Sequence, residues 1–302
     1  MSYHVPVLAG ESIDALAIKP DGIYIDATFG GGGHSALILD ALGDNGRLLG
    51  FDQDGDAAQN VPEDDRFTFV QHNFRFMKRF LRLYRVEKVD GILADLGVSS
   101  FQLDEGQRGF SYRFDADLDM RMNQGTGNTA ATILQEYGER ELVRVFSELG
   151  EVRNSKTLAA RIVEARRDHP LQTIGDFLAL LEPLIKGQRL RYLSQVFQAL
   201  RIEVNDEMGA LEDFLLQSME VLKPGGRLAI ITYHSIEDRM VKRFMKAGNM
   251  SGEPEKDFYG NINRPFELIS RKAILPPKEE LQRNPRSRSA KLRVAALKST
   301  EK

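Results

Sequence analysis

The chain is 302 residues long, which exceeds the usual size of one domain, so we expect one domain with an insertion or two domains. It contains no cysteine, which excludes disulfides, thiolate nucleophiles and thiolate metal sites. The formal net charge of -3 argues against a uniformly basic surface for nucleic acid. No stretch stays apolar for the roughly 18 residues that a membrane span needs, so we expect a cytoplasmic protein without a membrane partner.

Short apolar runs alternate with amphipathic stretches in the first part of the chain, in the order strand, helix, strand, helix. This order is typical of a parallel sheet that is covered by helices on both faces. Runs rich in Ile, Leu, Val or Phe predict strands at residues 22–26, 47–51, 67–71, 89–93 and 227–232. The expected fold class is therefore α/β, with a doubly wound and mostly parallel sheet.

The interval between the fourth and fifth strands contains helical patterns and no convincing strand. Apolar residues at helical spacing predict helices at residues 130–137, 139–149, 155–168 and 174–185. Because this interval is too long for one crossover helix, we expect an all-helical insertion domain. Its expected bounds are residues 106–193, and the α/β domain consists of residues 1–105 and 194–302.

Four consecutive glycines, Gly30 to Gly33, separate the first strand from an apolar helix. Glycines let a ligand approach the backbone, and the N-terminus of the helix offers N–H groups to a negative group. The alternative is a tight turn with close packing. Gly30, Gly32 and Ser35 match the dinucleotide fingerprint Gly-x-Gly-x-x-Gly except at its last position, which argues against NAD.

Candidate ligand-binding side chains follow the next three strands. Asp52 ends the second strand, where a carboxylate can accept hydrogen bonds from ribose hydroxyls. Phe74 follows the third strand and suits the face of an adenine and a core position equally. Asp95 follows the fourth strand, at the edge where parallel sheets bind their ligands.

His234 and Ser235 follow the fifth strand and lead into a helix. Ser235 suits the N-cap of that helix, whereas His234 is a candidate for a chemical role. We expect no metal site, because the chain has only five His and no Cys, without further ligands at a suitable spacing.

Basic residues cluster at residues 75–88 and again at 283–298. Such clusters suit a solvated face, and they also suit the phosphates of RNA. At residues 108–114, three aromatic residues interleave with two arginines, which suits either stacking on unpaired RNA bases or core packing.

The chain resembles the MraW (RsmH) family of methyltransferases, which modify N4 of a cytosine in bacterial 16S ribosomal RNA. The resemblance spans nearly the whole chain. It rests on HVPVL at 4–8, DATFGGGGHS at 26–35, DLGVSS at 95–100, QLD at 102–104, RGFS at 108–111, LDMRM at 118–122, FQALRI at 197–202, VN at 204–205, HSIEDR at 234–239, NPR at 284–286 and KLR at 291–293.

The resemblance implies a Rossmann-like, class I fold with a helical insertion, and S-adenosylmethionine as the cofactor. It implies a substrate at the decoding site of 16S ribosomal RNA, within the small ribosomal subunit, and leaves a homodimer open. The cofactor contacts that it implies are Gly32, Gly33, His34, Asp52, Phe74, Asp95 and Gln102.

Two alternatives stay open. An NAD-dependent dehydrogenase would explain the glycine loop and Asp52, and a non-catalytic RNA-binding assembly factor would explain the basic clusters. The second alternative does not explain Asp26, Asp52 and Asp95, because carboxylates do not help a protein to bind phosphates. For methyl transfer, which depends mainly on alignment of the reactants, Asp95 is the candidate acceptor of an N–H hydrogen bond from the base. His234 is the candidate that orients the base or relays the proton.

Overall fold

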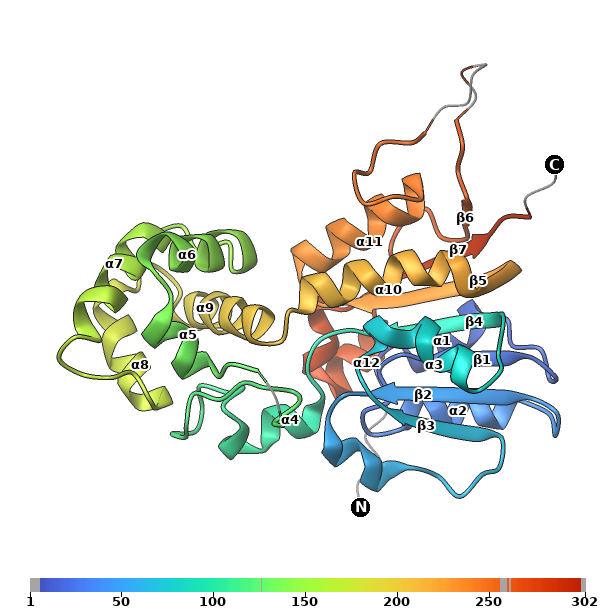
Figure 1. Cartoon of the computed structure of the whole chain (residues 1–302), viewed down its shortest axis with the longest axis horizontal. Helices are drawn as coiled ribbons and strands as arrows, with labels where there is room; N and C mark the ends of the chain where they lie inside the picture. Colours follow the sequence, from blue (N-terminus) through green and yellow to red (C-terminus); the bar gives the residue numbers. More distant parts are fainter. Residues whose placement is uncertain (1–5, 126, 256–259, 261, 300–302) are drawn as a thin grey trace. The chain divides into compact units, whose positions relative to one another are not determined.

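A computed structural model of the chain describes residues 6–125, 127–255, 260 and 262–299. His4 and Val5, which open the first segment of the family resemblance, lie outside the described residues. The chain divides into two compact units. Met1–Gly97 and Gly209–Lys302 form an α/β unit, and Val98–Met208 forms a helical unit (Figure 1).

Among the described residues of the α/β unit, seven strands form one sheet in the order β3-β2-β1-β4-β5-β7-β6. Strands β1 to β5 are parallel, whereas β7 pairs antiparallel with both β5 and β6. This confirms the doubly wound, mostly parallel sheet that the sequence predicts. The strands are β1 (Ile23–Asp26), β2 (Arg47–Asp52), β3 (Phe67–Gln71), β4 (Val89–Asp95), β5 (Leu222–Thr232), β6 (Phe266–Leu268) and β7 (Lys291–Leu297).

Helices cover both faces of the sheet. Leu48 of β2 packs in the core beneath α1 and α2. Because successive strand residues point to opposite faces, Phe51 lies on the other face, where its ring contacts that of Phe80 in α3. Hydrogen bonds tie α3 to α10, and α11 contacts β5, β6 and β7. These helices, with α12, are α1 (Ala9–Leu16), α2 (Gly33–Ala41), α3 (Met77–Leu83), α10 (Glu207–Val221), α11 (Ser235–Ala247) and α12 (Lys278–Arg283).

The last strand of the chain, β7, was not among the predicted strands. Its two basic residues, Lys291 and Arg293, made this segment look like part of a charged surface. In the structure these residues alternate with the buried Leu292 and Val294, which is the period of two that a strand requires. The strand is therefore part of the sheet, and only every second residue near its start is charged.

The helical unit has its own core, to which Phe146, Leu158, Phe177 and Phe197 contribute. The four predicted helices are present, and two of them end in short π-helical or 3₁₀ segments, Val145–Leu149 and Glu182–Leu184. The helices of this unit are α4 (Ser100–Asp104), α5 (Ala130–Glu136), α6 (Glu139–Arg144), α7 (Ser155–Ala165), α8 (Ile174–Leu181) and α9 (Arg189–Val204).

The helical unit extends beyond the bounds of 106–193 that the sequence suggested. The expected boundary after Leu193 falls inside α9, which is one continuous helix. Leu193, Val196 and Leu200 of this helix are all fully buried in the core of the helical unit. Because the buried face of α9 packs in this core, the structure places the boundary beyond this helix, after Met208, two residues into α10.

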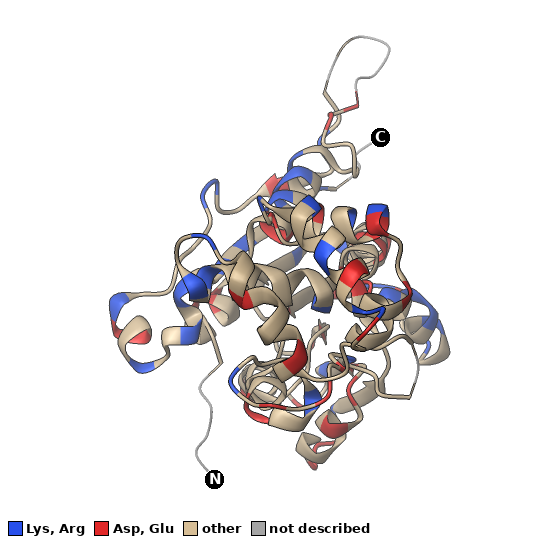
Figure 2. Ribbon diagram, turned by 90° about the vertical axis from the view of Figure 1, so that its left-hand side faces the viewer, with Lys and Arg blue, Asp and Glu red and all other residues tan. Residues whose placement is uncertain are grey.

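None of the described helices is long and apolar enough to cross a membrane. Acidic and basic residues are interspersed along the ribbon, as Figure 2 shows. This distribution agrees with the small formal net charge of the whole chain.

Candidate active site

The carboxyl ends of strands β1 to β5 meet at one edge of the sheet, and the strand order reverses between β1 and β4. In open α/β sheets, ligands bind at this point of reversal. Asp26 ends β1, Asp52 ends β2 and Asp95 ends β4. The structure therefore brings together the three carboxylates that the sequence placed at this edge.

The turn from β1 to α2 depends on glycine. Gly30 and Gly32 have φ angles of 51° and 77°, in the left-handed region that side chains disfavour, and Gly32 is the N-cap of α2. A Cβ atom on Gly33 would lie 3.1 Å from Pro6, whereas one on Gly31 would meet no described atom within 4 Å. Gly31 is therefore the open part of the loop, where a ligand can approach the backbone.

Asp52 holds this loop in place. Its carboxylate accepts hydrogen bonds from the N–H groups of Gly30, at 2.8 Å, and Asp54, at 2.9 Å. Burial raises the pKa of Asp52 to about 6, although the two N–H groups oppose this shift. A carboxylate offers about four lone-pair positions, so Asp52 keeps the capacity to accept hydrogens from two further hydroxyls.

His34 and Asp26 are buried at the same edge. The Nε2 atom of His34 lies 3.0 Å from the carbonyl oxygen of Val7, so Nε2 carries the hydrogen and Nδ1 faces Oδ2 of Asp95 at 3.9 Å. Asp26 accepts a hydrogen bond of 2.7 Å from the hydroxyl of Ser35. Burial raises the pKa of Asp26. Of these buried groups, His34 lies nearest to the carboxylate of Asp95, and Asp26 ties the end of β1 to α2.

Tyr233 is a residue of the site that the sequence did not single out. Its hydroxyl donates a hydrogen bond of 2.7 Å to Oδ1 of Asp95. Burial raises the pKa of Asp95 to about 6, while His34 and the bond from Tyr233 lower it. Burial and the charge of Asp95 raise the pKa of Tyr233, so the phenol keeps its proton and stays the donor.

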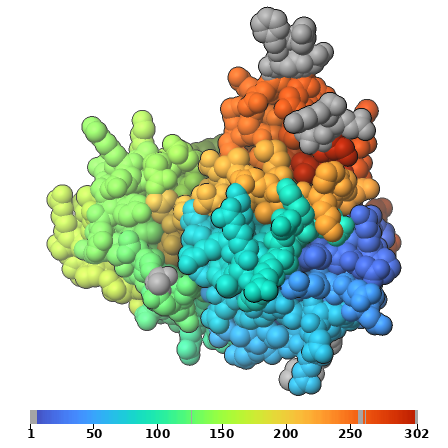
Figure 3. Space-filling model, turned by 45° about the vertical axis from the view of Figure 1, so that its right-hand side comes forward, coloured from blue at the N-terminus to red at the C-terminus, as the bar shows by residue number. Residues whose placement is uncertain are grey.

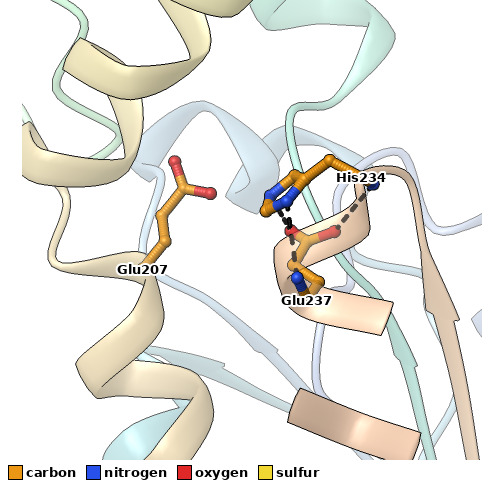
Figure 4. A group of neighbouring side chains, drawn as sticks. All are labelled: Glu207, His234 and Glu237. Carbon is orange, nitrogen blue, oxygen red and sulfur yellow. Dashed lines mark hydrogen bonds and ion pairs between the residues drawn. The ribbon is translucent and has the colours of Figure 1, made fainter. Parts of the chain in front are cut away.

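His234 is the N-cap of α11, the role that the sequence suggested for Ser235. The Ser235 interpretation was wrong because the imidazole does the capping: Nδ1 of His234 accepts from the N–H of Glu237 at 3.4 Å. In turn, Glu237 accepts from the N–H groups of Tyr233 and His234, at 3.0 and 3.4 Å. The Nε2 atom of His234 lies 2.9 Å from Oε1 of Glu237 (Figure 4). Glu207, also drawn there, is the first residue of α10.

Phe74 and Gln102 complete the set of expected cofactor contacts. Phe74 begins a 3₁₀ turn, Phe74–Phe76, after β3, and it is half-buried with its ring at 65° to that of Phe214 in α10. Gln102 belongs to the helical unit, where its side chain and that of Ser99 form a reciprocal cap at the start of α4. Their roles toward a cofactor stay predictions.

The aromatic and arginine residues at 108–114 divide between the two roles that the sequence left open. Arg108 is buried and donates hydrogen bonds to the carbonyl groups of Arg121 and Met122. Phe110 is also buried, below the guanidinium of Arg108. Phe114, in contrast, is 45% exposed. Arg108 and Phe110 therefore belong to the core of the helical unit, whereas Phe114 is exposed at its surface.

The C-terminal basic cluster is partly structural. Arg293 and Lys291 of β7 both bind the carboxylate of Asp238 in α11, at 2.6 and 3.3 Å. These contacts hold the last strand against the helix that follows β5. The single carboxylate of Asp238 offsets one of these two positive charges inside the α/β unit, so only part of this cluster remains for a partner.

The strand order of the sheet, with β7 inserted antiparallel between β5 and β6, is that of class I methyltransferases. The site agrees with this class, because a glycine loop and a carboxylate at the end of β2 stand beside an acid at the end of β4. The fold and the position of the site therefore match this class of enzyme.

Comparison with known proteins identifies the family. The model of the MraW methylase family matches residues 1–298, so the chain belongs to this family. Ribosomal RNA small subunit methyltransferase H of Bacteroides thetaiotaomicron is 56% identical over 299 residues, which cover 99% of this chain and 98% of that protein. The protein of the same name from Christiangramia forsetii is 55% identical over 296 residues and 98% of each chain. Among solved structures, a putative rRNA-methylase from Clostridium thermocellum matches with a TM-score of 0.46 and 14% identity, over 97% of this chain and 99% of that chain.

Proposed function

We propose that the chain transfers the methyl group of S-adenosylmethionine to N4 of a cytosine in 16S ribosomal RNA of the small ribosomal subunit. The observation that carries this proposal is the carboxylate of Asp95, held by Tyr233 at the point where the strand order reverses. Membership of the methylase family supports the reaction, and the names of the relatives support the substrate. A ribosomal substrate supports a cytoplasmic location for the enzyme.

The residues at the sheet edge fit S-adenosylmethionine. Asp52 has lone pairs left for the two ribose hydroxyls, and the backbone at Gly31 is open to a ligand. The partly exposed ring of Phe74 suits an adenine face, and Gln102 is a further proposed contact from the helical unit. When bound, the cofactor supplies an electrophilic methyl group on a sulfonium.

Asp95 acts on the amino group of the cytosine. That nitrogen is conjugated with the ring and becomes pyramidal during the reaction, so an acceptor for its N–H hydrogen favours the transition state over the ground state. Oδ1 of Asp95 is engaged by Tyr233, and Oδ2 is the proposed acceptor. As the new N–C bond forms, one proton leaves the nitrogen for Asp95. A pKa of about 6 suits this transfer near neutral pH.

Tyr233 and His234 are proposed to position Asp95. Glu237 accepts the N–H groups of both residues, so the cap of α11 fixes the backbone that carries the phenol. The Nδ1 atom of His234 caps α11, which supports this positioning role. Its buried Nε2 atom has no hydrogen-bond partner among the described residues, so the proton relay that the sequence suggested stays a second proposal.

The structure gives one further reason to prefer a methyltransferase over a dehydrogenase. Ser35 occupies the last position of the dinucleotide fingerprint, where close packing of helix and strand favours Gly or Ala. Here its hydroxyl donates to Asp26, so the loop is built around a polar bond between α2 and β1.

The proposal is tested by incubating the chain with 16S ribosomal RNA or with small subunits and S-adenosylmethionine that carries a radiolabelled methyl group. Mass spectrometry of nuclease fragments then locates the label. We expect one N4-methylcytosine at the decoding site. Label on another base or atom, or no transfer to either substrate, would contradict the proposal.

A further inference from the structure

The basic cluster at residues 75–88 divides into two groups in the structure. Three of its side chains are bound by α10: Arg75 pairs with Asp213 at 2.7 Å, Lys78 pairs with Glu220, and Lys88 donates to the backbone carbonyl of Glu220. These contacts join α3, the turn before it and the segment after it to α10. Their charges therefore stabilise the α/β unit.

Arg79, Arg82 and Arg85 form the second group. All three are exposed, and no carboxylate of the described residues pairs with any of their guanidinium groups. Exposed cations without counter-charges are available to a negatively charged partner. Figure 3 shows their segment, in cyan, on the surface of the face that it draws.

Two of these arginines line a shallow hollow of about 630 Å³, together with His72, Phe80 and Leu83. The ring of His72 contacts those of Phe76, at 4.8 Å, and Phe80, at 5.0 Å. Phe76 is 41% exposed and Leu83 is 68% exposed. Flat rings and unpaired cations therefore occur together. This combination is typical of surfaces that bind single-stranded nucleic acid, where bases stack on rings and cations follow the backbone.

The hollow begins at the same edge of the sheet as the active site. Asp52 of β2 is the register partner of Gln71 in β3, so His72 lies one residue beyond the level of Asp52. The side chain of Asn73 donates to Gln53, which joins the ends of the two strands. An RNA strand that passes this edge therefore meets the hollow without crossing the sheet.

We propose that this hollow and the exposed ring of Phe76 beside it bind single-stranded RNA that flanks the methylated nucleotide, with Arg79 and Arg82 on phosphates and a base stacked on Phe76. This inference rests on the proposed function, because it takes RNA as the substrate. The surface contributes affinity and is separate from the residues that transfer the methyl group.

The test measures binding of a fluorescein-labelled oligouridylate to the full-length chain at several salt concentrations. Each phosphate contact to a single strand contributes a slope of about 0.7 in a plot of log affinity against log salt, so Arg79→Ala with Arg82→Ala should reduce the slope by about 1.4. At 0.15 M salt this corresponds to roughly tenfold weaker binding. Phe76→Ala should weaken binding at least about fivefold and keep the slope, because stacking is not ionic.

The matched control is Arg243→Ala with Lys246→Ala, which removes the same charge from exposed positions at the same spacing in α11. It should keep the wild-type slope. If Arg79→Ala with Arg82→Ala also keeps the wild-type slope and affinity, the hollow does not bind RNA and the inference fails. An equal loss in both double variants would show a general charge effect and would also overturn it.

Binding of S-adenosylhomocysteine by each variant checks that the fold is intact. Oligouridylate contains no cytosine, so its binding does not depend on the chemical step. Failure of the wild type to methylate 16S ribosomal RNA while it still binds oligouridylate would therefore count against the proposed function and not against the hollow as a binding surface.

Discussion

Replacement of Tyr233 by Phe removes one hydroxyl and with it the hydrogen bond to Oδ1 of Asp95. A hydrogen bond to a charged group contributes about 1.5–3 kcal/mol, and one pKa unit corresponds to about 1.36 kcal/mol. Because this bond stabilises the ionised carboxylate, its loss should raise the pKa of Asp95 from about 6 by roughly one to two units.

The change in pKa predicts the change in rate. If transfer needs the ionised carboxylate of Asp95, activity falls as the pH drops through its pKa. At pH 7 about nine-tenths of the wild-type carboxylate is ionised, against about half to one-tenth in Tyr233→Phe. The variant should thus be about two- to tenfold slower at pH 7 and approach the wild-type rate near pH 9.

The assay is single-turnover methyl transfer from radiolabelled cofactor to 16S ribosomal RNA across the pH range, with cofactor affinity measured in parallel. Tyr24→Phe is the matched control. This change also removes a phenol hydroxyl that forms a hydrogen bond in the α/β unit. That hydroxyl accepts from the backbone N–H of Lys19, before β1. The reasoning would be refuted if the rate of Tyr233→Phe fell at the same pH as that of the wild type on acidification. It would also be refuted if the loss of rate were equal at every pH.

Three further predictions follow from the same structure. Asp95→Asn should keep much of the cofactor affinity and lose most of the methyl transfer, because the charge matters mainly in the transition state; a wild-type rate would remove Asp95 from the reaction. Asp52→Ala should weaken S-adenosylmethionine binding in calorimetry by about 1.5–3 kcal/mol, and unchanged affinity would exclude it from the site. Gly109→Ala should lower the thermal stability more than Gly127→Ala. Both have positive φ, but only at Gly109 would the Cβ lie 2.6 Å from a backbone oxygen, whereas at Gly127 it would meet no described atom within 4 Å. Equal loss in the two variants would contradict that packing argument.

The sequence by itself determined the five parallel strands of the sheet and the edge at which its site lies. Strands such as β4 are continuous apolar runs, because a parallel strand is buried on both faces. The carboxyl ends of parallel strands meet at one edge, so Asp52 and Asp95 were expected there before any tertiary contact was known. Four glycines before α2 indicated a ligand-binding loop in the same way, from local residues alone.

The sequence was less informative where one pattern suits two structures. In β7, the charges of Lys291 and Arg293 suggested a surface, although the neutralising Asp238 lies in another element. In α9, the helical pattern gave no sign of which core it joins. The bounds of the two units were therefore uncertain at this helix.

Only the tertiary structure decided how the side chains at the edge are used. Tyr233 and Asp95 are 138 residues apart, and no local period encodes a bond between them. The arginines and lysines of residues 75–88 look alike in the sequence, yet the carboxylates of α10 neutralise some of them and leave others free. Periodicity reports which side of an element is buried, whereas the partner of each polar group depends on how distant elements pack together.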